Sequence, residues 1–128
     1  VEVNGQECIG TIEISALGLK LPVISEWSYA KLKKAPCRYS GSAYLKNMII
    51  AGHNYRTHFS GIKRLDPGDS VVFTDADGNV FSYEVTEMET VGGYDIEKME
   101  GGDWDLTLFT CTNKGKARAA VRCREIEE

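Results

Sequence analysis

Apolar residues in this chain of 128 residues come in short runs, and glycine-containing turns separate the runs. The most apolar run, Met48–Ala51, is only as long as a strand and ends at Gly52. Val80–Thr86 alternates apolar and polar residues, which is typical of a strand with one buried face. The residues before it, Asp75–Asn79, have the composition of a hairpin turn. These patterns predict an all-β domain.

Seven strands can be placed from such runs. They are Gly10–Ile14, Leu19–Ile24, Asn47–Ala51, Asp69–Thr74, Val80–Val91, Asp105–Cys111 and Ala117–Ile126. One helix is expected at Ser28–Lys34, because Pro36 stops it, and Tyr94–Glu100 could form a helical turn or two. About eight strands at this spacing predict a sandwich or a closed barrel, in a single domain that spans residues 1–128.

The longest connection is Gly92–Asp103, which has paired glycines at both ends. Loops of this length in a compact domain often carry function. We therefore expect a mobile segment with a functional role.

Charge and residue spacing exclude several classes of protein. With 15 basic and 19 acidic side chains the net charge is −4, so nucleic acid is not an expected partner. No run approaches the roughly 18 apolar residues of a membrane helix. The chain opens at Val1 without a signal peptide, so we expect any targeting or anchoring segment to lie outside it.

The four cysteines and two histidines do not have the paired spacing of a structural zinc site. Asp75–Asn79 lacks the length and the closing glutamate of a calcium loop. No metal and no cofactor is predicted, and disulfides among the cysteines are left open.

Cys111 is the first candidate for chemistry. It stands where an apolar strand runs into a polar loop, and a strand end gives a rigid base with an accessible tip. The next charged residues are all basic: Lys114, Lys116, Arg118, Arg122 and Arg124. Nearby cations lower the pKa of a cysteine and favour the reactive thiolate. The structural alternative is a small buried hydrophobic residue at the end of a strand.

His53 has the same position at the end of another strand, whereas His58 lies deeper in the following loop. Beside a cysteine, an imidazole can hold the thiolate and later protonate a leaving amine. Arg118 begins the last strand and could stabilise an oxyanion. Arg122 competes with it, because a two-residue period puts both on one face. A loop histidine and a solvated basic stripe are the structural alternatives.

These motifs, in this order, resemble those of the sortases, the cysteine transpeptidases of Gram-positive cell surfaces. The sequence TLFTC at 107–111 is similar to the family's TLxTC signature, which ends at the nucleophile. Ala51-Gly52-His53 is similar to the Gly-His that supplies the catalytic histidine, and the sequence RAAV at 118–121 to the arginine-led final strand. The resemblance extends over nearly the whole chain.

The resemblance implies an eight-stranded sortase-type β-barrel with one or two short helices, compact and class A-like or class D-like. Cys111 would be the nucleophile, His53 the acid and base, and Arg118 the electrostatic support. Thr110 and Arg122 would contribute to substrate binding. The loop at 92–103 corresponds to the region that shapes specificity in the family.

The resemblance also implies the partners. Cys111 would cleave an LPxTG-like sorting signal of a secreted protein through a thioacyl-enzyme. An amine of a peptidoglycan precursor or of a pilin would then resolve it. The enzyme would act at the cell surface, anchored to the membrane by an N-terminal helix that is not in this sequence.

Two other functions are compatible with the same residues. A cysteine peptidase would use the same pair of residues with water as the acceptor. A non-catalytic β-barrel binding module would use its cysteines for packing alone, and Cys111 would then be unreactive.

Overall fold

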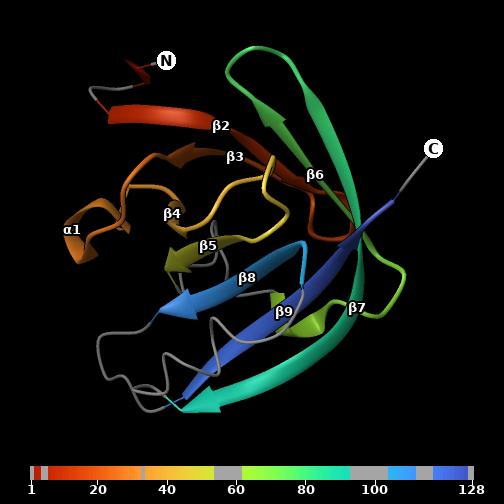
Figure 1. Cartoon of the computed structure of the whole chain (residues 1–128). Helices are drawn as coiled ribbons and strands as arrows, with labels where there is room; N and C mark the ends of the chain where they lie inside the picture. Colours follow the sequence, from red (N-terminus) through yellow and green to blue (C-terminus); the bar gives the residue numbers. More distant parts are fainter. Residues whose placement is uncertain are drawn as a thin grey trace.

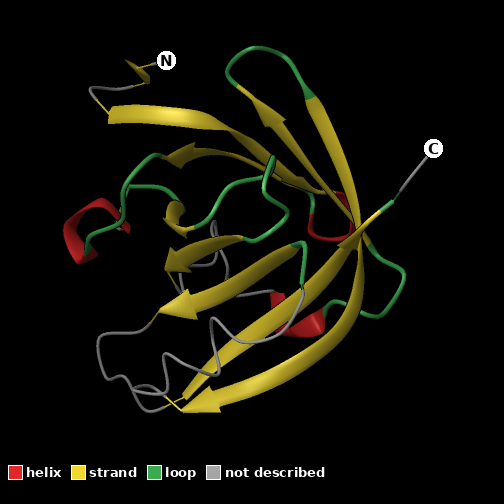
Figure 2. Cartoon of the chain, viewed as in Figure 1, coloured by secondary structure: helices red, strands yellow, loops and turns green. Residues whose placement is uncertain are grey.

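The computed structural model describes residues 2–3, 6–32, 34–53, 62–92, 104–111 and 117–126. Within them the chain is mostly strand, with short helical segments (Figures 1 and 2). The strands are β1 (Glu2–Val3), β2 (Gln6–Ile14), β3 (Leu19–Ile24), β4 (Cys37–Ser40), β5 (Met48–His53), β6 (Ser70–Asp75), β7 (Val80–Gly92), β8 (Leu106–Cys111) and β9 (Ala117–Glu125). The helical segments are η1 (Ser15–Leu17), α1 (Tyr29–Leu32) and η2 (Ile62–Arg64).

Eight of these strands close into a barrel. Their order is β2-β3-β4-β5-β8-β9-β7-β6, and β6 pairs with β2 to complete the ring. The two-residue strand β1 pairs with β2 outside the ring. Neighbours are antiparallel except for β3–β4 and β5–β8, which are parallel. The predicted eight-stranded barrel is confirmed.

Closure of the ring depends on a close approach between β2 and β6. A Cβ atom at Gly10 would lie 2.1 Å from the carbonyl oxygen of Thr74, so only glycine fits there. The register of β2 against β3 shifts between Cys8 and Gly10, which lets β2 bend at this point.

The structure differs from the predicted elements in a few places. Strand β4 was not predicted, because its four residues are too few to give a clear pattern, although Cys37 and Tyr39 alternate with Arg38 and Ser40. Helix α1 is shorter than the expected Ser28–Lys34. The backbone N–H of Lys31 donates to the Ser28 side chain at 3.1 Å at the start of the helix. The helical turns expected at 94–100 and most of the loop at 92–103 lie outside the described residues.

Two apolar clusters pack against the sheet, and strand alternation assigns residues to one or the other. Met48 and Ile50 of β5 belong to the first cluster, together with Val71, Tyr83, Leu106, Leu108 and Val121. Ile49 and Ala51 belong to the second, together with Cys37, Phe109 and Ala120. The first cluster fills the barrel and the second covers the other face of β5, β8 and β9.

No helix in the described ranges is long and apolar enough to span a membrane.

Candidate active site

Strands β5 and β8 run side by side in the same direction, so their carboxyl ends meet at one edge of the barrel (Figure 1). Their register pairs Met48 with Leu106 and ends with His53 opposite Cys111. Neighbouring strands lie about 4.8 Å apart. The two residues predicted to react therefore occupy adjacent backbone positions. Their side chains are not among those that the structure describes.

Strand β9 brings the third predicted residue to the same level. β8 and β9 pair from Leu106 opposite Cys123 to Phe109 opposite Ala120. Continued by two residues, this register puts Arg118 opposite Cys111. On its other side Arg118 pairs with Val91 of β7. The positions of His53, Cys111 and Arg118 thus form one row across three adjacent strands; the Arg118 side chain is also outside the described part.

A row of buried residues lies two positions before this one. Ala51, Phe109 and Ala120 pair across the same three strands, and each is 0% exposed. The backbone at the three candidate positions therefore continues from strands that are closely packed two residues away, and such packing holds a site in a precise geometry.

Aromatic side chains extend this base. The ring of Tyr39 packs edge-on against Phe109 with centroids 5.3 Å apart, and Trp27 lies 5.3 Å from Tyr39 on its other side. Trp27 is half-buried against the second cluster. Trp104 instead lies under the guanidinium of Arg124, at 4.4 Å.

Thr110, next to Cys111, ties β8 to β9. Its side chain is 7% exposed, and its Oγ1 accepts a hydrogen bond from the backbone N–H of Ala119 at 3.3 Å. This bond holds the two strands together one residue before the level of Cys111 and Arg118.

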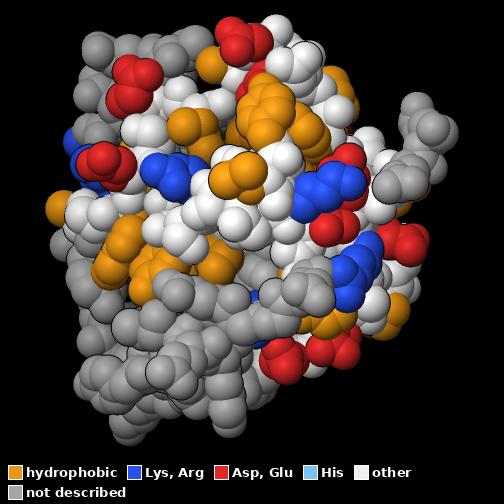
Figure 3. Space-filling view, in the orientation of Figure 1, with side chains coloured by type: hydrophobic (Ala, Val, Ile, Leu, Met, Phe, Trp, Pro, Cys, Tyr) orange, Lys and Arg blue, Asp and Glu red, His pale blue; other side chains and the backbone are white. Residues whose placement is uncertain are grey.

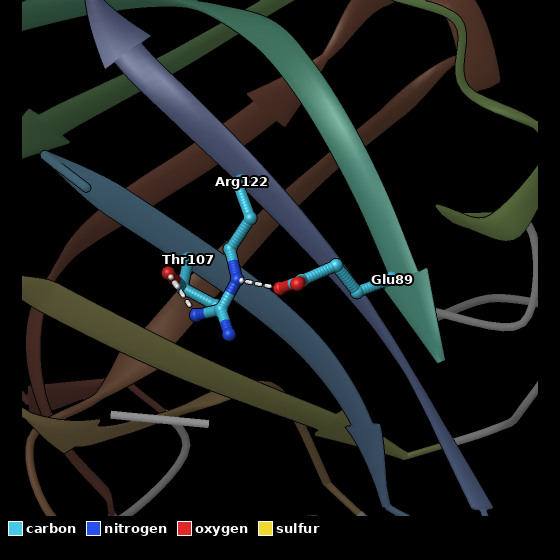
Figure 4. A network of polar contacts seen from close by, with 3 residues as sticks. All are labelled: Glu89, Thr107 and Arg122. Carbon is cyan, nitrogen blue, oxygen red and sulfur yellow. Dashed lines mark hydrogen bonds and ion pairs between the residues drawn. The ribbon is translucent and has the colours of Figure 1, made fainter. Parts of the chain in front are cut away.

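Arg122 is buried in a polar network that joins three strands (Figure 4). It is 2% exposed. Its Nε donates to Oε2 of Glu89 on β7 at 2.7 Å, and its Nη1 donates to Oγ1 of Thr107 on β8 at 3.1 Å. Four residues of strand, about 13 Å, separate Arg122 from Arg118.

Sequence reasoning did not identify Glu89 as the partner of Arg122. A signal was available in principle, because an arginine within an apolar strand pattern requires an acidic partner once it is buried.

The remaining cysteines have structural positions. Cys8, Cys37 and Cys123 are buried thiols, and the thiol of Cys37 donates to the carbonyl oxygen of Ala35 at 3.5 Å. Burial raises the pKa of Cys123 to about 12, so its thiolate is scarce at neutral pH. Across the described ranges, no group of three or more histidine, cysteine or acidic side chains could hold a metal ion.

Comparison with known proteins gives one family. The Sortase domain model matches residues 12–126. Among solved structures, the chain is similar to a Clostridium perfringens sortase D5 transpeptidase, with 26% identity over 99% of this chain and 83% of that one and a TM-score of 0.79. Streptococcus pneumoniae sortase C shares 27% identity over 99% of this chain and 69% of that chain, with a TM-score of 0.79. Clostridium perfringens sortase C, solved with the C-terminal cell wall sorting motif, shares 24% identity over 95% of this chain and 72% of that chain, with a TM-score of 0.80. No curated protein matches the chain in sequence.

Proposed function

This chain belongs to the sortase family of cysteine transpeptidases, and we propose that Cys111, His53 and Arg118 carry its acyl transfer. The observation that supports this assignment most directly is the register of β5 and β8, which pairs His53 with Cys111. A nucleophile and its acid–base partner must come within hydrogen-bond reach, and adjacent positions on neighbouring strands satisfy that requirement.

In the first half-reaction the thiolate of Cys111 attacks a backbone carbonyl carbon of an LPxTG-like sorting signal. A carbon–sulfur bond forms, and the electrons of the carbonyl double bond move onto its oxygen. When the tetrahedral intermediate collapses, the amide carbon–nitrogen bond breaks. The departing amine takes a proton from the imidazolium of His53, and a thioacyl-enzyme remains.

In the second half-reaction an amine attacks the thioester carbon. A new amide bond forms and the carbon–sulfur bond breaks, which regenerates the thiolate of Cys111. The proton released by the amine returns to His53. The proposed acceptor is an amine of a peptidoglycan precursor or of a pilin; water in its place would make the enzyme a peptidase.

The two arginines of β9 are assigned different roles. We assign oxyanion stabilisation or sorting-signal binding to Arg118, since its position continues the row of His53 and Cys111. The guanidinium of Arg122 is buried and held by Glu89 and Thr107. A direct contact of Arg122 with substrate stays a prediction, and its geometry favours support of the strand.

Thr110 is assigned a positioning role in substrate binding, because its hydroxyl already holds Ala119.

Sortases act on proteins of the cell surface. For this protein we propose an extracytoplasmic location and attachment to the cell membrane through an anchoring segment. Family membership supports this location.

The chemical assignment can be tested by alkylation in the native state. Iodoacetamide should modify Cys111 selectively, and Cys8, Cys37 and Cys123 only after denaturation, because all three are buried. Mass spectrometry of the digested protein identifies the modified residue. An inert Cys111, or one bound in a disulfide, would contradict the assignment and favour the binding module.

Turnover is tested with a quenched LPxTG-containing peptide, with and without an added amine. Triglycine represents a peptidoglycan cross-bridge, and a lysine-containing peptide represents a pilin. Cys111→Ala should abolish cleavage, and His53→Ala and Arg118→Ala should reduce it by at least about 100-fold. His58→Ala and Arg124→Ala are the matched controls and should retain activity. Cleavage without an amine-containing product would establish the peptidase instead.

A further inference from the structure

A cavity of about 210 Å³ opens at the other end of β5 from His53. Its apolar walls include Ile9 of β2, Ala43, Met48 of β5 and Phe73 of β6. Met48 is the first residue of β5 and His53 the last, so about 16 Å of strand separates the cavity from the catalytic row. The cavity therefore belongs to a different part of the barrel.

Large apolar side chains are exposed near the cavity, among charged ones (Figure 3). Tyr44, Leu45 and Val80 are 61%, 73% and 62% exposed. Figure 3 shows hydrophobic side chains gathered on this face, over the loop at 41–47 and the neighbouring β6–β7 hairpin. An apolar ligand group that enters the cavity would lose contact with water where the walls cover it.

One wall of the cavity contains Asp75, whose two carboxylate oxygens accept hydrogen bonds from neutral groups. Its Oδ1 accepts from the backbone N–H groups of Asp77 and Asn79, at 3.0 and 2.8 Å. Its Oδ2 accepts from the hydroxyl of Tyr44 and from the side-chain amide of Asn79. These bonds tie the loop at 41–47 to the β6–β7 hairpin. Asp75 thus holds the wall in place with its acceptor positions occupied, and its remaining negative charge places a ligand anion at the opposite, Arg38 side of the cavity.

Arg38 is the second charged group at the cavity, and its partners are neutral. Its Nε donates to the carbonyl oxygen of Ser25 at 3.1 Å, and its Nη1 to that of Gly41 at 3.0 Å. The two bonds fix the half-buried guanidinium beside the apolar walls. No carboxylate within the described ranges forms an ion pair with it. A cation in such surroundings attracts an anion more strongly than it would in water.

We propose that this cavity is a binding site for a short-chain aliphatic carboxylate. The chain would lie against Ile9, Met48 and Phe73, and the carboxylate would accept a charge-assisted hydrogen bond from Arg38. The volume, about 210 Å³, is below that of pockets for drug-sized ligands and suits one short chain.

Hexanoate is the probe, and NMR titration of the amide resonances is the measurement. We expect saturable shifts at residues 38–48 and 73–75 and no comparable shifts near 53 and 111. Acetate lacks the chain and hexanol lacks the charge, so each should bind at least about tenfold more weakly than hexanoate. Equal binding of hexanol, or shifts that do not saturate, would overturn the proposal.

Two variants test separately the charge of Arg38 and the volume of the cavity. Arg38→Gln should weaken hexanoate binding about tenfold and leave hexanol binding unchanged. Ala43→Leu should fill the cavity and weaken both ligands. Arg64→Gln removes an exposed arginine elsewhere and should bind like the parent. Hexanoate should also raise the melting temperature of the parent protein and not that of Ala43→Leu. Binding of hexanoate by Arg38→Gln with the affinity of the parent protein would refute the assignment of Arg38 as the carboxylate-binding group.

Discussion

Replacing Glu89 with glutamine removes one charge from the Arg122 network and preserves the shape of the side chain. The Arg122 side chain is 3% exposed and the Glu89 side chain 43%. Breaking a fully buried pair costs about 3–5 kcal/mol, and exposed pairs contribute about 0.2–1 kcal/mol. Because water reaches Glu89 and Thr107 continues to accept from Arg122, we expect a loss of about 1.5–2.5 kcal/mol of unfolding free energy.

Urea unfolding at pH 7, followed by circular dichroism, measures this loss. Glu84→Gln is the matched control, since Glu84 is an exposed acid on the same strand that pairs with Arg124 and not with Arg122, and this change should alter stability by less than about 0.5 kcal/mol. A double-mutant cycle with Arg122→Met should give a coupling of about 1–2 kcal/mol. Equal effects of the Glu84 and Glu89 variants, or a coupling below about 0.5 kcal/mol, would refute a stabilising role for the pair.

Three further predictions follow from buried groups and close contacts. Tyr83 is 0% exposed and its hydroxyl has no hydrogen-bond partner among the described residues, so Tyr83→Phe should stabilise the protein by about 1 kcal/mol in thermal or urea unfolding. Burial raises the pKa of Cys123 from 9.0 to about 12; its neutral thiol therefore contributes stability that is complete below pH 9 and declines towards pH 12. Unfolding free energies measured across this range should fall less steeply in Cys123→Ala, and an unchanged slope would count against the assignment. Gly10→Ala brings a Cβ within 2.1 Å of the Thr74 oxygen and should lower the melting temperature strongly, whereas Gly18→Ala, with no atom within 4 Å of its Cβ, should lower it less.

The sequence pattern predicts most strands of this barrel because their alternation is local. Strand β4 was missed because four residues are too few to give a clear alternation, and its pairing with Ile49–Ala51 is decided only in the folded sheet. The same limit applies to Arg118 and Arg122. Alternation predicts that both lie on one face, but it contains no information about burial.

The partner of Arg122 depends on register. Glu89 is reached only because the pairing of β7 with β9 shifts between Val85 and Glu87. A shift of this kind has no signature in a single sequence. The pairing of His53 with Cys111 likewise follows from two strands that meet in parallel, and hydrophobic periodicity cannot specify which strands become neighbours.

The parallel pairing of β5 with β8 also has a kinetic consequence. His53 and Cys111 are 58 residues apart in the chain, and β6 and β7 lie between their strands in sequence. Contacts of such high contact order form late and slowly in folding. A nascent chain would therefore contain a cysteine with no imidazole beside it until the ring is nearly complete. Recovery of catalytic activity during refolding would then report barrel closure itself, with little signal from earlier local hairpins.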